Sequence, residues 1–234
     1  MRQIGFSTGA LARGDFRAAL KILRRHNIPI VELSALRVEE LTPLVNAVPS
    51  LDLEGFSFVS VHAPSRFSAE EEGRVIDQLG LLADRKYPVV VHPDVIREPQ
   101  KWTALGTWLT IENMDKRKPI GRTARELHDI FLQLPAARFC FDIGHARQVD
   151  PSMTEATLLL NAFGDRLIEV HMSEVNTASR HDPISLNAVM AFSGIAASIS
   201  ENIPIILEPL IDQGQSDVET ELQRAHDAFA AVAA

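Results

Sequence analysis

The chain has 234 residues, of which 46% are hydrophobic and 23% are charged, values close to the average for soluble globular proteins. This length suits one large barrel domain or two small domains. The net charge of −8 argues against a duplex nucleic-acid partner, because phosphate neutralisation supplies much of the affinity of such binders, although a local basic groove is not excluded. The single cysteine, Cys140, excludes an internal disulfide, and no apolar run reaches about 18 residues. We therefore expect a cytoplasmic protein without a membrane span or a secretion signal.

Short, continuously apolar runs recur along the chain and predict eight strands that are covered on both faces. Each run is too short for a surface helix, and most follow a proline, a glycine or a charged turn. In chain order the expected strands cover Ile4–Ser7, Ile30–Leu33, Phe58–His62, Val89–His92, Trp108–Glu112, Phe139–Asp142, Leu167–His171 and Ile205–Glu208.

Segments with helical periodicity lie between these runs. Within Asp15–His26, for example, Phe16 and Leu20 fall on one face and Lys21 on the opposite face. The other expected helices cover Val38–Val48, Ser68–Arg85, a short and weakly signalled segment around Pro99–Leu105, Thr123–Leu134, Thr154–Phe163, Ser185–Ile199 and Val218–Ala233.

This alternation of strands and helices indicates a parallel α/β fold, for which a closed barrel and a doubly wound open sheet compete. The segment after the first strand, Ser7–Leu11, does not match the glycine-rich dinucleotide fingerprint. The repeats are nearly even, and polar residues follow many strands, whereas an open sheet concentrates them at one switch point. The sequence therefore predicts a single (β/α)8 TIM barrel, with residues 1–234 forming one domain.

Histidines and carboxylates gather at the expected carboxyl ends of the strands. Five of the eight histidines lie there, while His26, His128 and His226 fall on helical segments and are expected at the surface. The set in chain order is His62, His92, Glu112, Asp142, His145, His171, His181 and Glu208.

In a barrel the carboxyl ends of the strands surround one opening, so these side chains would be crowded together. Such crowding is costly unless a divalent cation compensates, because a cation favours ionised carboxylates and neutral imidazoles. A lone histidine at a strand end is more often a hydrogen-bonded loop residue, and a lone carboxylate often caps a helix. Eight such residues in phase with the strands instead predict a divalent-metal site, of which His145 and His181 are the weakest members. Mixed ligands of this kind suit Zn, Mn, Co or Fe better than Ca or Mg.

The ordered motifs resemble those of the xylose isomerase-like barrel superfamily, which includes sugar isomerases, sugar epimerases and endonuclease IV-type AP endonucleases. The resemblance covers nearly the whole chain, through His62-Ala-Pro, His92-Pro, Glu112-Asn, Asp142-x-Gly-His145, His171, Arg180-His181 and Glu208-Pro. In the epimerase branch it implies one Mn- or Co-type ion held by Glu112, Asp142, His171 and Glu208. His145 and Arg180 would then contact substrate oxygens.

In the endonuclease IV branch the same positions imply three zinc ions. His62, His92 and Glu112 would hold the first, and Glu112, Asp142, His171 and Glu208 would hold the second, with Glu112 bridging the two. His145 and His181 would hold the third together with an aspartate two residues before His181. Here that position is Ser179, which puts the third ion in doubt, although Asp182 is close in sequence.

The sequence favours a metal-dependent isomerase or epimerase of a small sugar-like substrate, in which Glu112 and Glu208 exchange a carbon-bound proton as base and acid. The alternative is a zinc phosphoesterase, supported by His92, which has no necessary role in a one-metal epimerase. A metal-binding barrel without turnover is the third hypothesis. A nucleic-acid partner is disfavoured but not excluded, no membrane partner is expected, and the oligomeric state stays open. The roles of Glu32 and Glu174, beside the second and seventh strands, also stay open.

Overall fold

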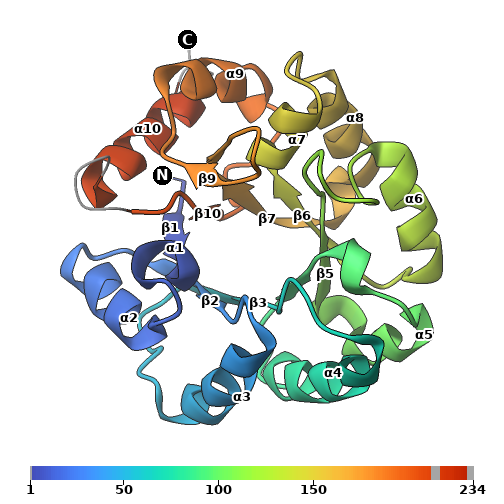
Figure 1. The fold of residues 1–234 in the computed structure, drawn as a ribbon. Helices are drawn as coiled ribbons and strands as arrows, with labels where there is room; N and C mark the ends of the chain where they lie inside the picture. The colour runs from blue at the N-terminus through green and yellow to red at the C-terminus, as the bar shows by residue number, and fades with distance from the viewer. Residues whose placement is uncertain (1, 212–216, 231–234) are drawn as a thin grey trace.

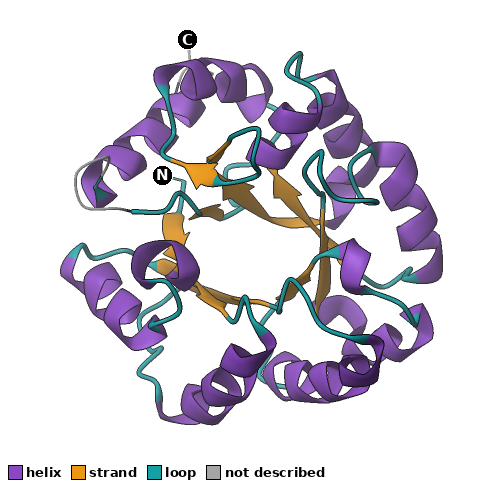
Figure 2. Ribbon diagram, viewed as in Figure 1, coloured by secondary structure: helices purple, strands orange, loops and turns teal. Residues whose placement is uncertain are grey.

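The computed structural model describes residues 2–211 and 217–230 and consists of a closed barrel of parallel strands inside a ring of helices (Figures 1 and 2). The (β/α)8 barrel predicted from the sequence is confirmed. Around the barrel the strands follow the order β1-β10-β7-β6-β5-β4-β3-β2, so that β10 closes the sheet against β1. The barrel strands are β1 (Ile4–Ser7), β2 (Ile30–Ser34), β3 (Phe58–His62), β4 (Val89–Val91), β5 (Leu109–Glu112), β6 (Arg138–Asp142), β7 (Leu167–Met172) and β10 (Ile205–Leu207).

The strands form where short apolar runs are covered from both sides. All residues of β2, β4 and β5 are buried, as expected for a parallel sheet with packed side chains inside and helices outside. On the outside, Phe139 of β6 packs against Phe131 and Phe163 with ring centroids 6.3 and 5.7 Å apart. On the inside, strands approach closely at Gly5, where a Cβ atom would lie 2.1 Å from the carbonyl oxygen of Ile30.

The helices of the outer ring begin where the sequence supplies capping residues. Asp15, Thr123 and Ser185 each accept a hydrogen bond from a backbone N–H of the first turn that follows them, and Ser68 forms a capping box with Glu71. The helices are α2 (Phe16–Arg25), α3 (Val38–Ala47), α4 (Ala69–Ala83), α5 (Pro99–Trp102), α6 (Ala124–Gln133), α8 (Thr154–Phe163), α9 (Leu186–Ala196) and α10 (Val218–Ala230). The predicted end of the last helix, residues 231–233, lies outside the described residues.

Several element boundaries differ from the prediction. The strands β4 and β10 each end one residue early, because His92 and Glu208 are followed by prolines, which cannot donate a ladder hydrogen bond. Trp108, predicted in a strand, belongs to a 3-10 segment (Thr103–Trp108) that follows the short α5.

Two short helices and two short strands near the strand ends were not predicted, since they are too short to show a period. The helix α1 (Thr8–Ala12) follows β1 directly, and α7 (Ile143–Val149) follows β6 directly. After β7, the strands β8 (Glu174–Val175) and β9 (His181–Asp182) form a small antiparallel hairpin beside the opening (Figure 1). Among the described residues, no helix is long and apolar enough to cross a bilayer.

Candidate metal centre

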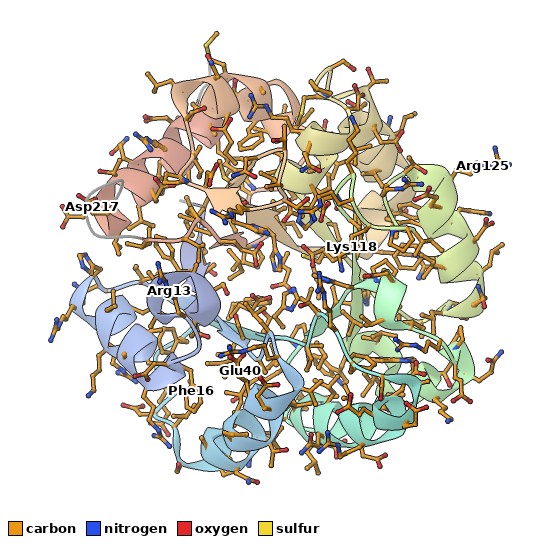
Figure 3. All side chains as sticks on the ribbon, viewed as in Figure 1. Arg13, Phe16, Glu40, Lys118, Arg125 and Asp217 are labelled. Atoms are coloured by element: carbon orange, nitrogen blue, oxygen red, sulfur yellow. The ribbon has the colours of Figure 1, made fainter. Side chains whose placement is uncertain are left out.

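The barrel brings the predicted site residues together at the carboxyl ends of its strands. His62, Glu112 and Asp142 are the last residues of β3, β5 and β6, and His171 is the second-last residue of β7. His92 and Glu208 directly follow β4 and β10, His145 lies in α7, and His181 begins β9. Most of them line a cavity of about 610 Å³ at the barrel mouth, where Figure 3 shows Lys118 beside the opening.

Glu112 lies at the centre of this arrangement, and only 1% of its side chain is exposed. Its Oε2 atom is 3.3 Å from His62 Nε2 and 3.1 Å from His92 Nε2. Its Oε1 atom is 3.5 Å from His145 Nδ1 and 3.4 Å from His171 Nδ1. One carboxylate therefore presents a separate oxygen to each of two groups of imidazoles, as a carboxylate that bridges two cations does.

The first possible ligand group consists of His62, His92 and Glu112, whose ligand atoms all lie within 4.8 Å of one another. His62 Nδ1 donates to the carbonyl oxygen of Ala63 at 2.8 Å, which leaves Nε2 as the nitrogen that would be available to a cation. His92 Nδ1 is 3.4 Å from Lys118 Nζ, leaving its Nε2 to face Glu112.

The second group consists of Glu112, Asp142, His171 and Glu208, again with ligand atoms within 4.8 Å of one another. Asp142 Oδ1 accepts the backbone N–H of His145 at 2.6 Å. Asp142 Oδ2 and His171 Nδ1, by contrast, are fully buried and make no hydrogen bond with the described residues. Buried polar atoms without partners are costly. These two atoms therefore fit a cation, and the residues present suit the metal that the fold resemblance implies.

The third group consists of Asp142, His145 and His181, of which Asp142 is shared with the second. His145 Nδ1 donates to the carbonyl oxygen of Asn113 at 2.9 Å, and His181 Nδ1 lies 2.9 Å from Ser173 Oγ. The two rings are 5.3 Å apart, and for neither Nε2 atom is a hydrogen bond or ion pair found among the described residues.

No separate carboxylate completes the third group within the described part of the chain. Ser179, at the position where the endonuclease IV motif has an aspartate, donates a 2.6 Å hydrogen bond to Asp115 Oδ1. Asp182 accepts from Asn176 at 2.8 Å and belongs to no ligand group, so its closeness in sequence does not bring it to the site. Arg180 lines the cavity mouth with an exposed side chain.

The motifs around β5 and β6 hold the site in shape. Asn113 clamps the two strand ends, because its Oδ1 accepts the N–H of Asp142 and its Nδ2 donates to the carbonyl oxygen of Asp142, both at 2.8 Å. A Cβ atom on Gly144 would lie 2.4 Å from the carbonyl oxygen of Ser173, so the turn into α7 requires glycine. Sequence reasoning gave Asn113 and Ser173 no role, although Asn113 stood in the Glu112-Asn motif.

Without a cation, the crowding of buried carboxyl groups and imidazoles shifts their pKa values. Burial raises the pKa of Glu208 to about 8, so this carboxyl tends to keep its proton at neutral pH, and raises the pKa of Asp142 to about 6. Burial also acts to raise the pKa of Glu112, but three neighbouring imidazoles, His171 foremost and then His62 and His92, bring it well below its ordinary value. Burial lowers the pKa of His181 to about 3, which leaves the ring neutral and available as a ligand.

Comparison with known proteins identifies the fold. No protein-family model matches the sequence, and no curated protein matches it significantly. Among solved structures, endonuclease IV from Thermus thermophilus is 16% identical, with 98% of each chain covered and a TM-score of 0.61. A protein from Sinorhizobium meliloti 1021 is 12% identical, with 98% of each chain covered and a TM-score of 0.66. The chain has the fold of the xylose isomerase-like barrels.

A third structure of this fold shows that the likeness spans more than one activity. A protein from Anabaena variabilis ATCC 29413, described as a candidate sugar phosphate isomerase/epimerase, is 15% identical, with 99% of this chain and 97% of that chain covered and a TM-score of 0.54. At these identities the likeness concerns the fold, which hosts different chemistries on one scaffold. The choice between activities therefore depends on the site itself.

Proposed function

We propose that this protein is a hydrolase of phosphate esters that uses two zinc ions bridged by Glu112. The observation that carries the proposal is the position of Glu112, with Oε2 facing His62 and His92 and Oε1 facing His171. A one-ion centre needs only the second ligand group. The first group would then have no role, although its two imidazoles lie 3.1 and 3.3 Å from the same carboxylate oxygen.

The donor atoms support zinc as the metal. The first group supplies two imidazoles and one carboxylate, the ligand set of many catalytic zinc sites, in which three protein ligands leave a position open. Bound in pairs, such cations supply Lewis-acid chemistry, making water a better nucleophile at neutral pH and neutralising charge on a phosphoryl group.

Basic side chains at the mouth support an anionic substrate. Arg66, Arg117, Lys118 and Arg180 all line the cavity, in a chain whose net charge is −8. Lys118 is paired with Asp94 at 2.8 Å, and Arg117 donates to the carbonyl oxygen of Ala178. For Arg66 and Arg180 no side-chain partner is found among the described residues. Two arginines without a carboxylate partner at the mouth would attract and orient a phosphate.

The size of the cavity favours a small phosphate ester or a chain end over an intact duplex. About 610 Å³ lies within the range of small-molecule pockets. The described residues that line it include no tyrosine, tryptophan or phenylalanine that could wedge into a stack of bases. Trp102 is fully buried elsewhere, in contact with Phe67.

A metal-dependent isomerase or epimerase is the second candidate, because the second ligand group is complete without the first. In that case Glu112 and Glu208, which lie 3.4 and 3.5 Å from His171 Nδ1, would serve as the base and acid proposed from the sequence.

The deciding experiment measures zinc per chain together with hydrolysis of bis(p-nitrophenyl) phosphate, of p-nitrophenyl phosphate and of an abasic-site oligonucleotide. We expect two zinc ions and phosphate-ester hydrolysis that is lost in His92→Ala. The matched control is His128→Ala, which removes an exposed histidine of α6 far from the site and should keep both properties. One ion per chain, no hydrolysis, and deuterium incorporation into a ketose in heavy water would replace the proposal with the second candidate.

A further inference from the structure

A second layer of polar side chains lies inside the barrel, one step below the ligand groups. Glu32 and Ser60 are paired in the register of β2 and β3, and Cys140 and Glu169 are paired in that of β6 and β7. All four residues are fully buried. A charged layer at this depth is unusual, because the interiors of such barrels are filled mainly with branched apolar side chains.

The two glutamates of this layer differ in their partners. Glu169 Oε2 accepts a 2.8 Å hydrogen bond from Ser60. Both carboxylate oxygens of Glu32, in contrast, are buried and make no hydrogen bond with the described residues. A carboxylate in that condition is strongly destabilising unless a cationic group lies close to it. The group that lies close to Glu32 is the imidazole of His171, whose Nε2 is 3.1 Å from Glu32 Oε2.

The two nitrogens of His171 therefore face different layers. Nδ1 faces upward to Glu112 and Glu208, at 3.4 and 3.5 Å, whereas Nε2 faces downward to Glu32. A histidine that binds a metal through one nitrogen usually donates the N–H of the other to a carboxylate or carbonyl, which fixes its tautomer and its orientation. Glu32 stands where that acceptor is required.

We propose that Glu32 is a positioning residue of the metal centre: it accepts the Nε2–H of His171 and thereby turns the Nδ1 lone pair toward Asp142, Glu112 and Glu208. The atoms are already at hydrogen-bond distance, while the N–H is not yet aligned with the oxygen. Polar contacts in empty sites often align only when the site is filled.

This role predicts effects of opposite sign on metal binding and on stability. Without metal, Glu32 is a buried carboxylate with no hydrogen bond to the described residues, and His171 keeps a second carboxylate, Glu112, 3.4 Å from its Nδ1 when Glu32 is removed. The removal of Glu32 therefore leaves no unpaired imidazolium and should leave the metal-free protein as stable as before or more stable. With metal, the same change should weaken binding at the second ligand group. A residue that only helps to hold the fold would instead lower the stability of the metal-free protein when changed.

The test compares Glu32→Gln and Glu32→Leu with Glu169→Gln. The Glu169 variant is the matched control, because it changes the other carboxyl of the same layer, which also lies near His171, while keeping an acceptor for Ser60. Zinc affinity is measured by chelator competition, and the geometry of the site by the visible absorption of the cobalt-substituted protein. Metal-free stability is measured by thermal unfolding in chelator.

For Glu32→Leu we expect zinc affinity to fall about 10- to 100-fold with an altered cobalt spectrum, and the Tm of the metal-free protein to hold or rise. Glu32→Gln should lose less affinity, since its amide oxygen still accepts, and Glu169→Gln should lose least. Equal losses in both Gln variants, unchanged affinity in Glu32→Leu, or a lower metal-free Tm in both Glu32 variants would overturn the proposal.

The inference depends on His171 as a ligand and not on the reaction. Protein that binds zinc through His171 but hydrolyses no phosphate ester would end the proposed function and leave the role of Glu32 intact. Hydrolysis of phosphate esters together with unchanged metal affinity in the Glu32 variants would leave the proposed function intact and end the proposed role of Glu32.

Discussion

The number of bound cations can be inferred from how much zinc raises the Tm, and His92→Ala is the informative substitution. His92 belongs only to the first ligand group, where its Nε2 lies 3.1 Å from Glu112 Oε2. The second group keeps all four of its ligands in this variant. The substitution should therefore remove one ion from two and leave the other in place.

The expected size follows from linkage between binding and folding. A cation buffered at about 100 times its dissociation constant stabilises the native state by about 2.7 kcal/mol for each site, so two sites contribute about 5 kcal/mol. For a chain of this length, about 1 kcal/mol corresponds to roughly 2–4 °C in Tm. Zinc should then raise the Tm of the wild-type protein by roughly 10–20 °C and that of His92→Ala by about half as much.

The assay is thermal unfolding followed by circular dichroism, in chelator and in a zinc buffer, with metal content determined on the same samples. His128→Ala serves as the control, since its side chain is exposed on α6. If wild type and His92→Ala gain the same Tm and carry one ion each, then Glu112 does not bridge two cations and the argument for a two-ion centre fails.

Three further predictions concern the third group, the turn after β6 and the pH. Ser179→Asp should raise the zinc content by one ion per chain, because Ser179 lines the same cavity as His145 and His181 and stands where the endonuclease IV motif has an aspartate; metal analysis checks this. Gly144→Ala should lower the Tm and the zinc affinity together, because its Cβ would lie 2.4 Å from the carbonyl oxygen of Ser173; unfolding and chelator competition measure both. Burial raises the pKa of Glu208 from 4.5 to about 8, so across this window the folded metal-free protein keeps a proton on this carboxyl that the unfolded chain has lost. Its stability should therefore fall as the pH rises from about 5 to 8, and a rise over that range, measured in chelator, would contradict the burial of this carboxylate.

The barrel and its gathered strand ends could be predicted from the sequence because both follow from short-range patterns. Continuous apolar runs such as Val89–Val91 indicate buried parallel strands, and the fold then decides that residues such as His62 and Glu208 meet at one opening. The helices α1 and α7 were not predicted, since five and seven residues are too few to show a helical period of apolar residues.

The details that separate one activity from another could not be predicted. Which oxygen of Glu112 faces which histidine depends on the stagger of the strands around the barrel, and no local pattern records that stagger. Likewise, the sequence left open whether Glu32 supports the site or lies at the surface. The apolar run of β2 does not show whether the one carboxylate within it points into the barrel or out of it. The structure places it inside, 3.1 Å from His171.

The charge enclosed by the barrel provides a separate argument for two cations. Among the described residues, five carboxylates occupy the two upper layers of its interior: Glu32, Glu112, Asp142, Glu169 and Glu208. One divalent ion would leave three of these negative charges to be neutralised by protons or imidazolium groups, whereas two ions leave one. Glu169 is suited to keep that last proton, because burial raises its pKa to about 7. A third ion would exceed the negative charge of the interior and would need an anion from outside. The third group has no carboxylate of its own in the described part of the chain, and Asp115, a buried carboxylate that lines the same cavity, is held by Ser179 and the backbone N–H of Arg117. The rim above carries Arg66 and Arg180, which would accept a further anion that comes with the substrate.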